Sequence, residues 1–148
     1  MKPPVHASAG ALAMLCIVSF WTSTALSELF MSHDAVTAVK QAILHAMWVF
    51  IPAMAITGGS GFSLARARSG RLVASKSRRM RFIALNGLLI MLPAAFFLAR
   101  KAAASEFDTV FYIVQAVELL VGMVQLSLMG LNFRDGLRLA GRLRPVRS

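Results

Sequence analysis

Four long apolar segments dominate the pattern of hydrophobic and polar positions in this chain. They cover about residues 9–31, 36–64, 82–99 and 109–133. An α-helix needs roughly 20 apolar residues to cross the ~30 Å hydrocarbon core of a bilayer, and each segment approaches or exceeds that length. The pattern predicts an all-α integral membrane protein, in which a single domain of 148 residues forms a four-transmembrane-helix bundle.

The fourth segment carries a polar stripe within its apolar sequence. Alternate steps of three and four residues, which follow one face of a helix, select Asp108, Phe111, Gln115, Glu118, Gly122, Gln125, Met129 and Asn132. Lipid offers no hydrogen bonds to carboxylates and amides, so we expect this face to contact protein, water or a ligand. The spacing is compatible with a face turned into the bundle and with a seam between two copies of the chain.

An ionisable pair is predicted near the middle of the membrane. Glu118 lies about ten residues from either end of its segment, and His45 lies about ten residues into the second segment. A carboxylate at that depth marks a functional site by default. The predicted midplane site comprises His45, Trp48, Met91, Gln115, Glu118 and Met123.

Haem b is one expected ligand of this midplane site. Imidazole is a common axial ligand of haem iron, and four-helix bundles hold cofactors between facing helices. Leu44-His45 followed by Trp48 resembles the second helix of small four-helix bacterial membrane proteins of the copper-resistance D and membrane cytochrome b type. The resemblance implies a redox or electron-transfer role, and an enzyme of this kind would be a membrane haem oxidoreductase. The ligand opposite His45 would then be Met91 or Met123, or the haem would stay five-coordinate.

A proton-coupled relay or small-solute transporter is the second expected function. His45 and Glu118 would exchange a proton, and Gln115, Gln125 and Asn132 would provide a wet path toward the inner surface. Four helices are few for a transporter, so this function predicts a homodimer. The small residues expected to pack its interface are Ala53, Thr57, Gly122 and Gly130.

The third alternative is a non-catalytic membrane assembly or interaction protein. In that case His45 and Glu118 would pair only to set the register of the helices. An inner polar layer is also predicted, because Asn86 and Gln125 reach nearly the same depth, with Thr57 as a third member. Hydrogen bonds of this kind hold transmembrane helices together, each contributing on the order of 0.6 kcal/mol.

The charge distribution predicts how the chain sits in its membrane. The net charge is +10, and 13 of the 16 cations are Lys2, seven residues within 65–81 and five residues within the tail 134–148. This is the positive-inside pattern of a protein with both termini in the cytoplasm, and it predicts a basic cytoplasmic loop at 65–81 and a basic amphipathic tail on the inner leaflet. The expected partners are the lipid bilayer and its anionic headgroups, not nucleic acid, since no aromatic residues interleave the cations. The excess of Arg over Lys and the abundance of Ala suggest a bacterial inner membrane.

Two further candidate sites lie near the surfaces. A glycine-rich turn followed by arginines predicts a nest for phosphate or anionic lipid, formed by Gly58, Gly59, Gly61, Arg66 and Arg68. At the opposite surface, three residues that carry oxygen and nitrogen ligands make a weak metal site: Glu28, His33 and Asp34. The single Cys16 is expected to be a small buried hydrophobe, and the Ser and Cys residues lack the His and Asp neighbours that nucleophilic catalysis needs.

Overall fold

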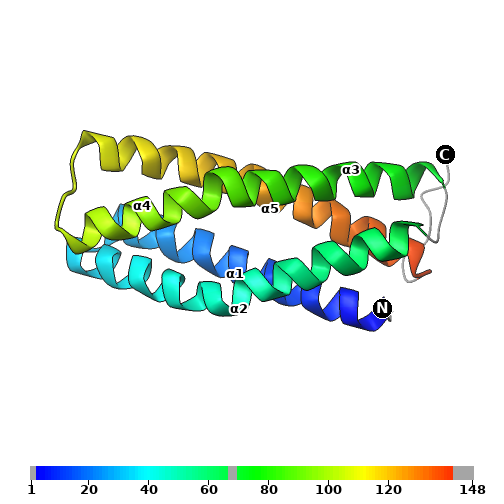
Figure 1. Ribbon diagram of the computed structural model, residues 1–148. Coiled ribbons are helices and arrows are strands. Elements are labelled where there is room, and N and C mark those ends of the chain that lie inside the picture. The colour runs from blue at the N-terminus through cyan, green and yellow to red at the C-terminus, as the bar shows by residue number, and fades with distance from the viewer. Residues whose placement is uncertain (1–2, 67–69, 142–148) are drawn as a thin grey trace.

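The computed structural model describes residues 3–66 and 70–141, and nearly all of them are helical. The elements in chain order are α1 (Pro3–Phe30), α2 (His33–Arg66), α3 (Arg71–Asn86), the π-helical turn η1 (Gly87–Met91), α4 (Leu92–Ala103) and α5 (Thr109–Leu139). α3, η1 and α4 follow one another without a break and form one long rod (Figure 1). Four helical segments are therefore long and apolar enough to cross a membrane, as the sequence predicts.

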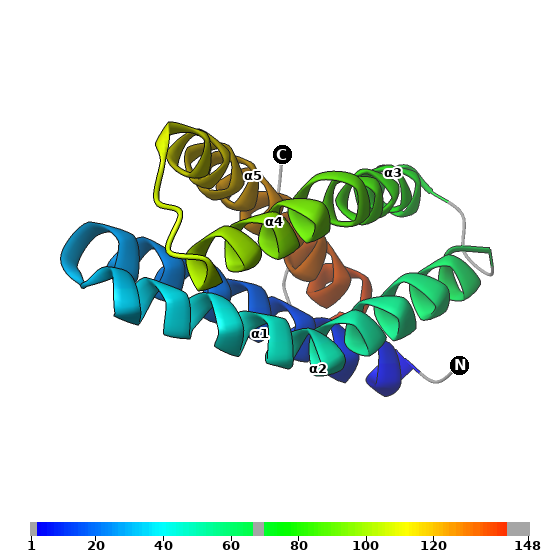
Figure 2. The same cartoon turned by 60° about the vertical axis from the view of Figure 1, so that its left-hand side comes forward.

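The four rods run antiparallel to their neighbours in the chain (Figure 1). We call one end of the bundle the terminal end: α1 and α3 start there, and α2 and α5 end there. The opposite end, which holds the connections at 31–32 and 104–108, is the hairpin end. α1 packs against α2 and α5, α4 packs against α2 and α5, and α3 packs chiefly against α5. α2 and α3 diverge toward the terminal end (Figure 2).

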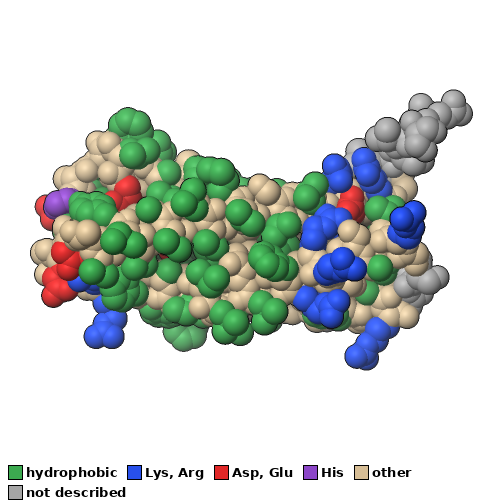
Figure 3. Space-filling view, turned by 90° about the horizontal axis from the view of Figure 1, so that it is seen from above, with side chains coloured by type: hydrophobic (Ala, Val, Ile, Leu, Met, Phe, Trp, Pro, Cys, Tyr) green, Lys and Arg blue, Asp and Glu red, His purple; other side chains and the backbone are tan. Residues whose placement is uncertain are grey.

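The outer surface of the bundle shows why it needs an apolar solvent. Hydrophobic side chains cover the middle of the molecule, basic side chains gather at the terminal end, and acidic side chains lie at the hairpin end (Figure 3). Large side chains such as Leu88, Leu89 and Leu120 are more than half exposed. Soluble proteins rarely present so large an apolar surface, whereas lipid tails cover it without cost.

Local sequence signals explain where the helices begin and where one widens. The side chain of Asp108 accepts a hydrogen bond of 2.9 Å from the backbone N–H of Phe111 and so caps α5. Ser32 caps α2, because its Oγ accepts a hydrogen bond from the N–H of Ala35 at 3.3 Å. Pro93 has no N–H for the preceding turn, and the rod widens there into the π-helical turn η1.

Two expectations about the surface segments are wrong. The segment 65–81 was expected to be a basic loop, but α2 continues to Arg66 and α3 begins at Arg71. The tail from residue 134 was expected to lie on the membrane surface, but α5 continues through Leu139 and Asp135 is almost fully buried. Arginines of α3 and α5 pair with the buried carboxylate of Asp135, which favours the extension of both helices; Arg79 Nη2 lies 2.5 Å from Asp135 Oδ2. Residues 142–148 lie outside the described part of the chain.

Candidate functional site

The polar stripe of α5 faces the other helices of the same chain. Its buried members are Phe111, Gln115, Gly122, Gln125, Met129 and Asn132, and Asp135 continues the stripe by one more step. The side chain of Glu118 is 14% exposed, so it also lies largely inside. The period of three and four residues therefore identified an inward face, and not a seam for a second copy.

A buried lysine from α2 meets this stripe in the half of the bundle nearest the hairpin end. The ammonium of Lys40 is 3.3 Å from Glu118 Oε2 and donates a short hydrogen bond to the side-chain oxygen of Gln115. The Gln115 amide in turn donates to Glu118 Oε2 at 3.0 Å. Lys40 is only 3% exposed, so its charge is solvated by these side chains instead of by water.

A second carboxylate completes this cluster from α1. Glu28 Oε1 lies 3.9 Å from the Lys40 ammonium, within ion-pair range but too far for a hydrogen bond. The Glu28 side chain is 9% exposed, and this same oxygen has no hydrogen-bond partner among the described residues. We call Glu28, Lys40, Gln115 and Glu118 the charge cluster; its two carboxylates share one ammonium.

Sequence reasoning missed Lys40, although a signal for it was present. Lys40 is one of the three cations outside the positive-inside set, and the charge distribution alone therefore places it at the opposite surface. However, it follows the buried Val36 by four residues and precedes the buried Met47 by seven, so all three lie on one face of α2. A cation on the apolar face of a transmembrane helix requires a buried acidic partner, and Glu118 was the available one.

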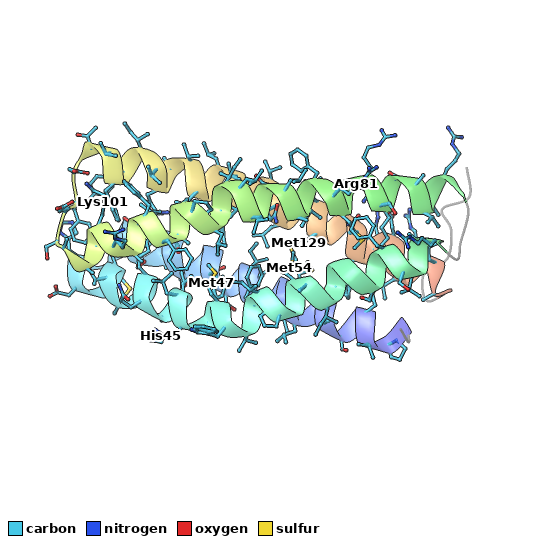
Figure 4. All side chains as sticks on the ribbon, in the orientation of Figure 1. His45, Met47, Met54, Arg81, Lys101 and Met129 are labelled. Atoms are coloured by element: carbon cyan, nitrogen blue, oxygen red, sulfur yellow. The ribbon has the colours of Figure 1, made fainter. Side chains whose placement is uncertain are left out.

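The predicted contact between His45 and Glu118 is not formed. His45 is exposed and projects from the outer edge of the bundle, whereas Met54 and Met129 point into its interior (Figure 4). Its Nδ1 lies 2.7 Å from the carbonyl oxygen of Gln41 in its own helix. Five residues separate His45 from Lys40, and at about 100° per residue they point in directions roughly 140° apart. The prediction rested on depth along the helix and did not consider rotation about its axis.

The residues around His45 do not fit a haem held inside the bundle. Trp48, which was expected beside His45 in the site, is 83% exposed on the same outward face of α2. Met123 is 52% exposed on α5, and the methyl group of Met91 points toward Gly122. None of the described side chains supplies a second axial ligand opposite His45 within the bundle, so the residues present do not fit a haem held there.

The inner polar layer is present for two of its three members. The side-chain amide of Asn86 donates to Gln125 Oε1 at 2.7 Å, and the Gln125 amide donates to the carbonyl oxygen of Ile83 at 3.0 Å. Both side chains are buried between the third rod and α5. Thr57 does not join them, because its hydroxyl bonds the carbonyl of Ala53 in its own helix at 2.7 Å.

The glycine-rich segment forms no anion nest. α2 remains helical through Gly58, Gly59 and Gly61, so their N–H groups serve the helix instead of converging on a ligand. Gly61 is instead a point of close packing, because a Cβ there would collide with the side chain of Met80. Arg66 is exposed, and Arg68 lies outside the described residues.

The weak metal site at the hairpin end is not assembled. Glu28 turns to Lys40, Asp34 is exposed, and His33 stacks on Phe107 with ring centroids 3.9 Å apart. The described residues include no group of three or more His, Cys, Asp or Glu side chains arranged to hold a metal ion.

The small residues expected at a homodimer interface pack within the monomer. Gly122 lies under the indole of Trp21, whose Nε1 donates to the carbonyl of Leu119 at 2.9 Å. Ala53 is buried in the central core, and Gly130 faces Met14 of α1. Gly122 and Ala53 are therefore buried by contacts within one chain, and Gly130 is partly buried.

Two adjoining cavities continue from the charge cluster toward the terminal end. The central cavity, of about 420 Å³, has mostly apolar walls, with Glu118 and Gln125 among its lining residues. The inner cavity, of about 540 Å³, is lined by all four rods and includes Asn132, His6 and Lys76. The two cavities share four lining residues, namely Met54, Gly58, Ile83 and Ala84, so they adjoin where α2 and α3 diverge.

At the hairpin end, Lys101 links the connection between α4 and α5. Its ammonium lies 2.7 Å from Asp108 Oδ2 and 3.2 Å from Glu106 Oε2. The ammonium of Lys101 and the N–H of Phe111 lower the pKa of the Asp108 carboxyl below its ordinary value. The cap of α5 is therefore ionised at neutral pH.

Comparison with known proteins adds no relative to this picture. No protein-family model matches the chain, and no significant match was found among curated proteins or among solved structures. The features of the molecule that bear on its function are the charge cluster and the cavities.

Proposed function

We propose that this protein is a proton relay that spans a membrane, with the charge cluster as its exchange site. The observation that carries the proposal is the stoichiometry of that cluster: two buried carboxylates, Glu28 and Glu118, face one buried ammonium, that of Lys40. The fully ionised cluster has one net negative charge, which is costly in a medium of low dielectric constant. One bound proton neutralises it, and that proton has two carboxylates between which to exchange.

The position of the two carboxylates suits transfer along the bundle axis. Glu28 lies two residues before the end of α1, close to the hairpin end. Glu118 lies nine residues into α5 and lines the central cavity. A proton entering at Glu28 would pass beside Lys40 to Glu118, then through water in the central cavity to Gln125 and on toward Asn132 at the terminal end. Gln125 and Asn132 belong to the wet path predicted from the sequence, whereas Glu28 takes the place expected for His45.

The orientation that follows places the terminal end in the cytoplasm. Among the described residues, Arg66, Arg71, Arg78 and Arg81 are exposed at that end. By the positive-inside rule both termini are cytoplasmic, and the arginine-rich composition favours the inner membrane of a bacterium. Glu28 then faces the outer surface, where protons enter the relay.

Proton flux into vesicles tests the proposal directly. The purified protein would be reconstituted into vesicles that contain a pH-sensitive dye, and a potassium diffusion potential would drive protons inward. Glu118→Gln keeps the shape of the side chain but cannot exchange a proton, so we expect its flux to fall to the level of protein-free vesicles. Glu106→Gln is the matched control, because it makes the same change at a side chain that is 59% exposed at the hairpin end; its flux should equal that of the wild type.

Two results would reject the relay. One is a wild-type flux no greater than that of protein-free vesicles. The other is a Glu118→Gln variant with unchanged flux, which would leave the cluster as a structural device that sets helix register. Thermal unfolding of both variants in detergent is measured in parallel, so that a loss of flux through misfolding is recognised.

A further inference from the structure

The inner cavity has the character of a binding site and not of a simple packing defect. Its volume of about 540 Å³ lies within the range of roughly 300–1,000 Å³ typical of ligand pockets. Native cores contain few voids larger than a water molecule, so a space of this size among four helices needs an occupant. Its walls are mainly apolar and include four methionines, one from each rod: Met14, Met54, Met80 and Met129. Methionine side chains adapt to flexible apolar ligands.

Two polar groups that line this cavity are suited to an anion. Lys76 and His6 line it from α3 and α1. Lys76 is only partly exposed, and its ammonium occupies space that Gly136 leaves free, since a Cβ at that position would lie 2.9 Å from Lys76 Nζ. The glycine thus allows the cation to reach inward from α3 instead of extending into solvent.

Among the described residues, more arginines than carboxylates lie close to Lys76 in the fold. One buried carboxylate, that of Asp135, is shared by three arginines: Arg79, Arg134 and Arg138, at 2.5, 3.5 and 4.0 Å. Within the described part of the chain, buried Arg79 Nη1 has no hydrogen-bond acceptor. An anionic headgroup at Lys76 would meet a field of the opposite sign and a free buried donor nearby.

We propose that the inner cavity binds one anionic phospholipid, with an acyl chain among the methionines and the phosphate at Lys76 and His6. Residues of α2 and α3, which diverge toward the terminal end (Figure 2), both line the cavity, and the acyl chain would enter it from the bilayer between these two helices. A Cβ added at Gly58, which lines the cavity, would meet no heavy atom within 4 Å, so open space lies beside α2 at this position. This site replaces the nest expected from the glycine-rich turn: the glycines supply space, and the cation comes from α3.

Native mass spectrometry of the full-length protein in detergent tests the site. Phosphatidylglycerol or phosphatidylcholine with identical acyl chains is added, and the bound fraction is measured for each. The wild type should retain one phosphatidylglycerol at least tenfold more tightly than phosphatidylcholine. Lys76→Gln should weaken phosphatidylglycerol binding about tenfold or more, which is the effect of losing one hydrogen bond to a charged group. Arg81→Gln is the matched control on the same helix, because Arg81 points outward (Figure 4) and its loss should change binding less than twofold.

A second pair of variants tests the acyl-chain part of the site without altering charge. Gly58→Leu adds an apolar side chain to the wall of the inner cavity, and Gly59→Leu adds the same side chain at a position that lines only the central cavity. We expect the first to weaken binding and the second to leave it unchanged. Equal binding of the two lipids, equal effects of the Lys76 and Arg81 variants, or full binding to Gly58→Leu would each overturn the proposal. The readout is binding, so it is independent of whether protons move.

Discussion

Replacement of Lys40 by methionine is the sharpest test of the charge cluster. The change keeps most of the length of the side chain and removes only the ammonium. The two carboxylates of Glu28 and Glu118, 9% and 14% exposed, would then face each other with no cation between them. Removing one partner of a buried ion pair costs about 3–5 kcal/mol, because the remaining charge is unpaired in a low-dielectric interior. We expect Lys40→Met to lower the free energy of unfolding by that amount.

The two-to-one stoichiometry predicts a marked asymmetry. Glu118→Gln leaves Lys40 paired with Glu28, so the cluster becomes neutral and the hydrogen bond from Gln115 still has an oxygen acceptor. Its cost should be no more than about 1.5 kcal/mol, the net value of a typical hydrogen bond. In the double variant, Lys40→Met with Glu118→Gln, only one carboxylate is unpaired. Its cost should therefore be at least about 1 kcal/mol smaller than the sum of the two single costs.

Reversible unfolding in mixed micelles provides the measurement. Sodium dodecyl sulfate is titrated into protein in a mild detergent, and tryptophan fluorescence is followed. Trp21 reports packing because it is half-buried and donates to α5 at 2.9 Å, whereas Trp48 is 83% exposed. Equal costs for Lys40→Met and Glu118→Gln would refute the reasoning, since a simple one-to-one pair behaves in that way. A loss of less than about 1 kcal/mol in the free energy of unfolding for Lys40→Met would also refute the reasoning, because ion pairs open to water contribute no more than that.

Two further predictions concern the start and the middle of α5. The pKa of Asp108 is lowered in the folded protein, so its ionised carboxylate stabilises the fold above the ordinary pKa of 3.8, and this stabilisation is lost as pH falls through the folded pKa. The higher thermal stability of the wild type over Asp108→Asn should therefore disappear in acid. A stability difference that persists in acid would contradict the role of Lys101. In the inner polar layer, Gln125→Leu alone leaves the side-chain amide of Asn86 unsatisfied and should lower the free energy of unfolding by about 1–3 kcal/mol. The double variant Gln125→Leu with Asn86→Leu should lower it by less, since replacing both partners is nearly neutral. An equal or greater loss of stability in the double variant would contradict this prediction.

Local periodicity was sufficient to predict the class of fold and the inward face of α5. Apolar length depends on bilayer thickness alone, so four spans could be counted without any tertiary information. The stripe from Gln115 to Asn132 could be identified because residues three and four apart lie on one face of any helix. The contact between Asn86 and Gln125 was also predictable, since two amides at equal depth in apolar helices have few other partners.

The partners of Glu118 were decided by the tertiary structure. His45 and Lys40 both lie within α2 at depths compatible with Glu118, and sequence distance cannot tell which of them the packed helix turns inward. That choice depends on the rotation of α2 about its axis, which is set by the packing of Val36 and Met47 against the other helices. The same rotation turns His45 and Trp48 outward, and with them the expected haem site.

The ends of the helices were likewise decided by contacts distant in sequence. Arginines near residue 79 and beyond residue 133 suggested surface segments, because isolated cations avoid apolar surroundings. The buried Asp135 changes this balance: its pairing with Arg79, 56 residues away in the chain, holds α3 and α5 together and lets both continue as helices. Apolar length and helical period are properties of each segment by itself, whereas rotation, end position and charge pairing exist only between segments.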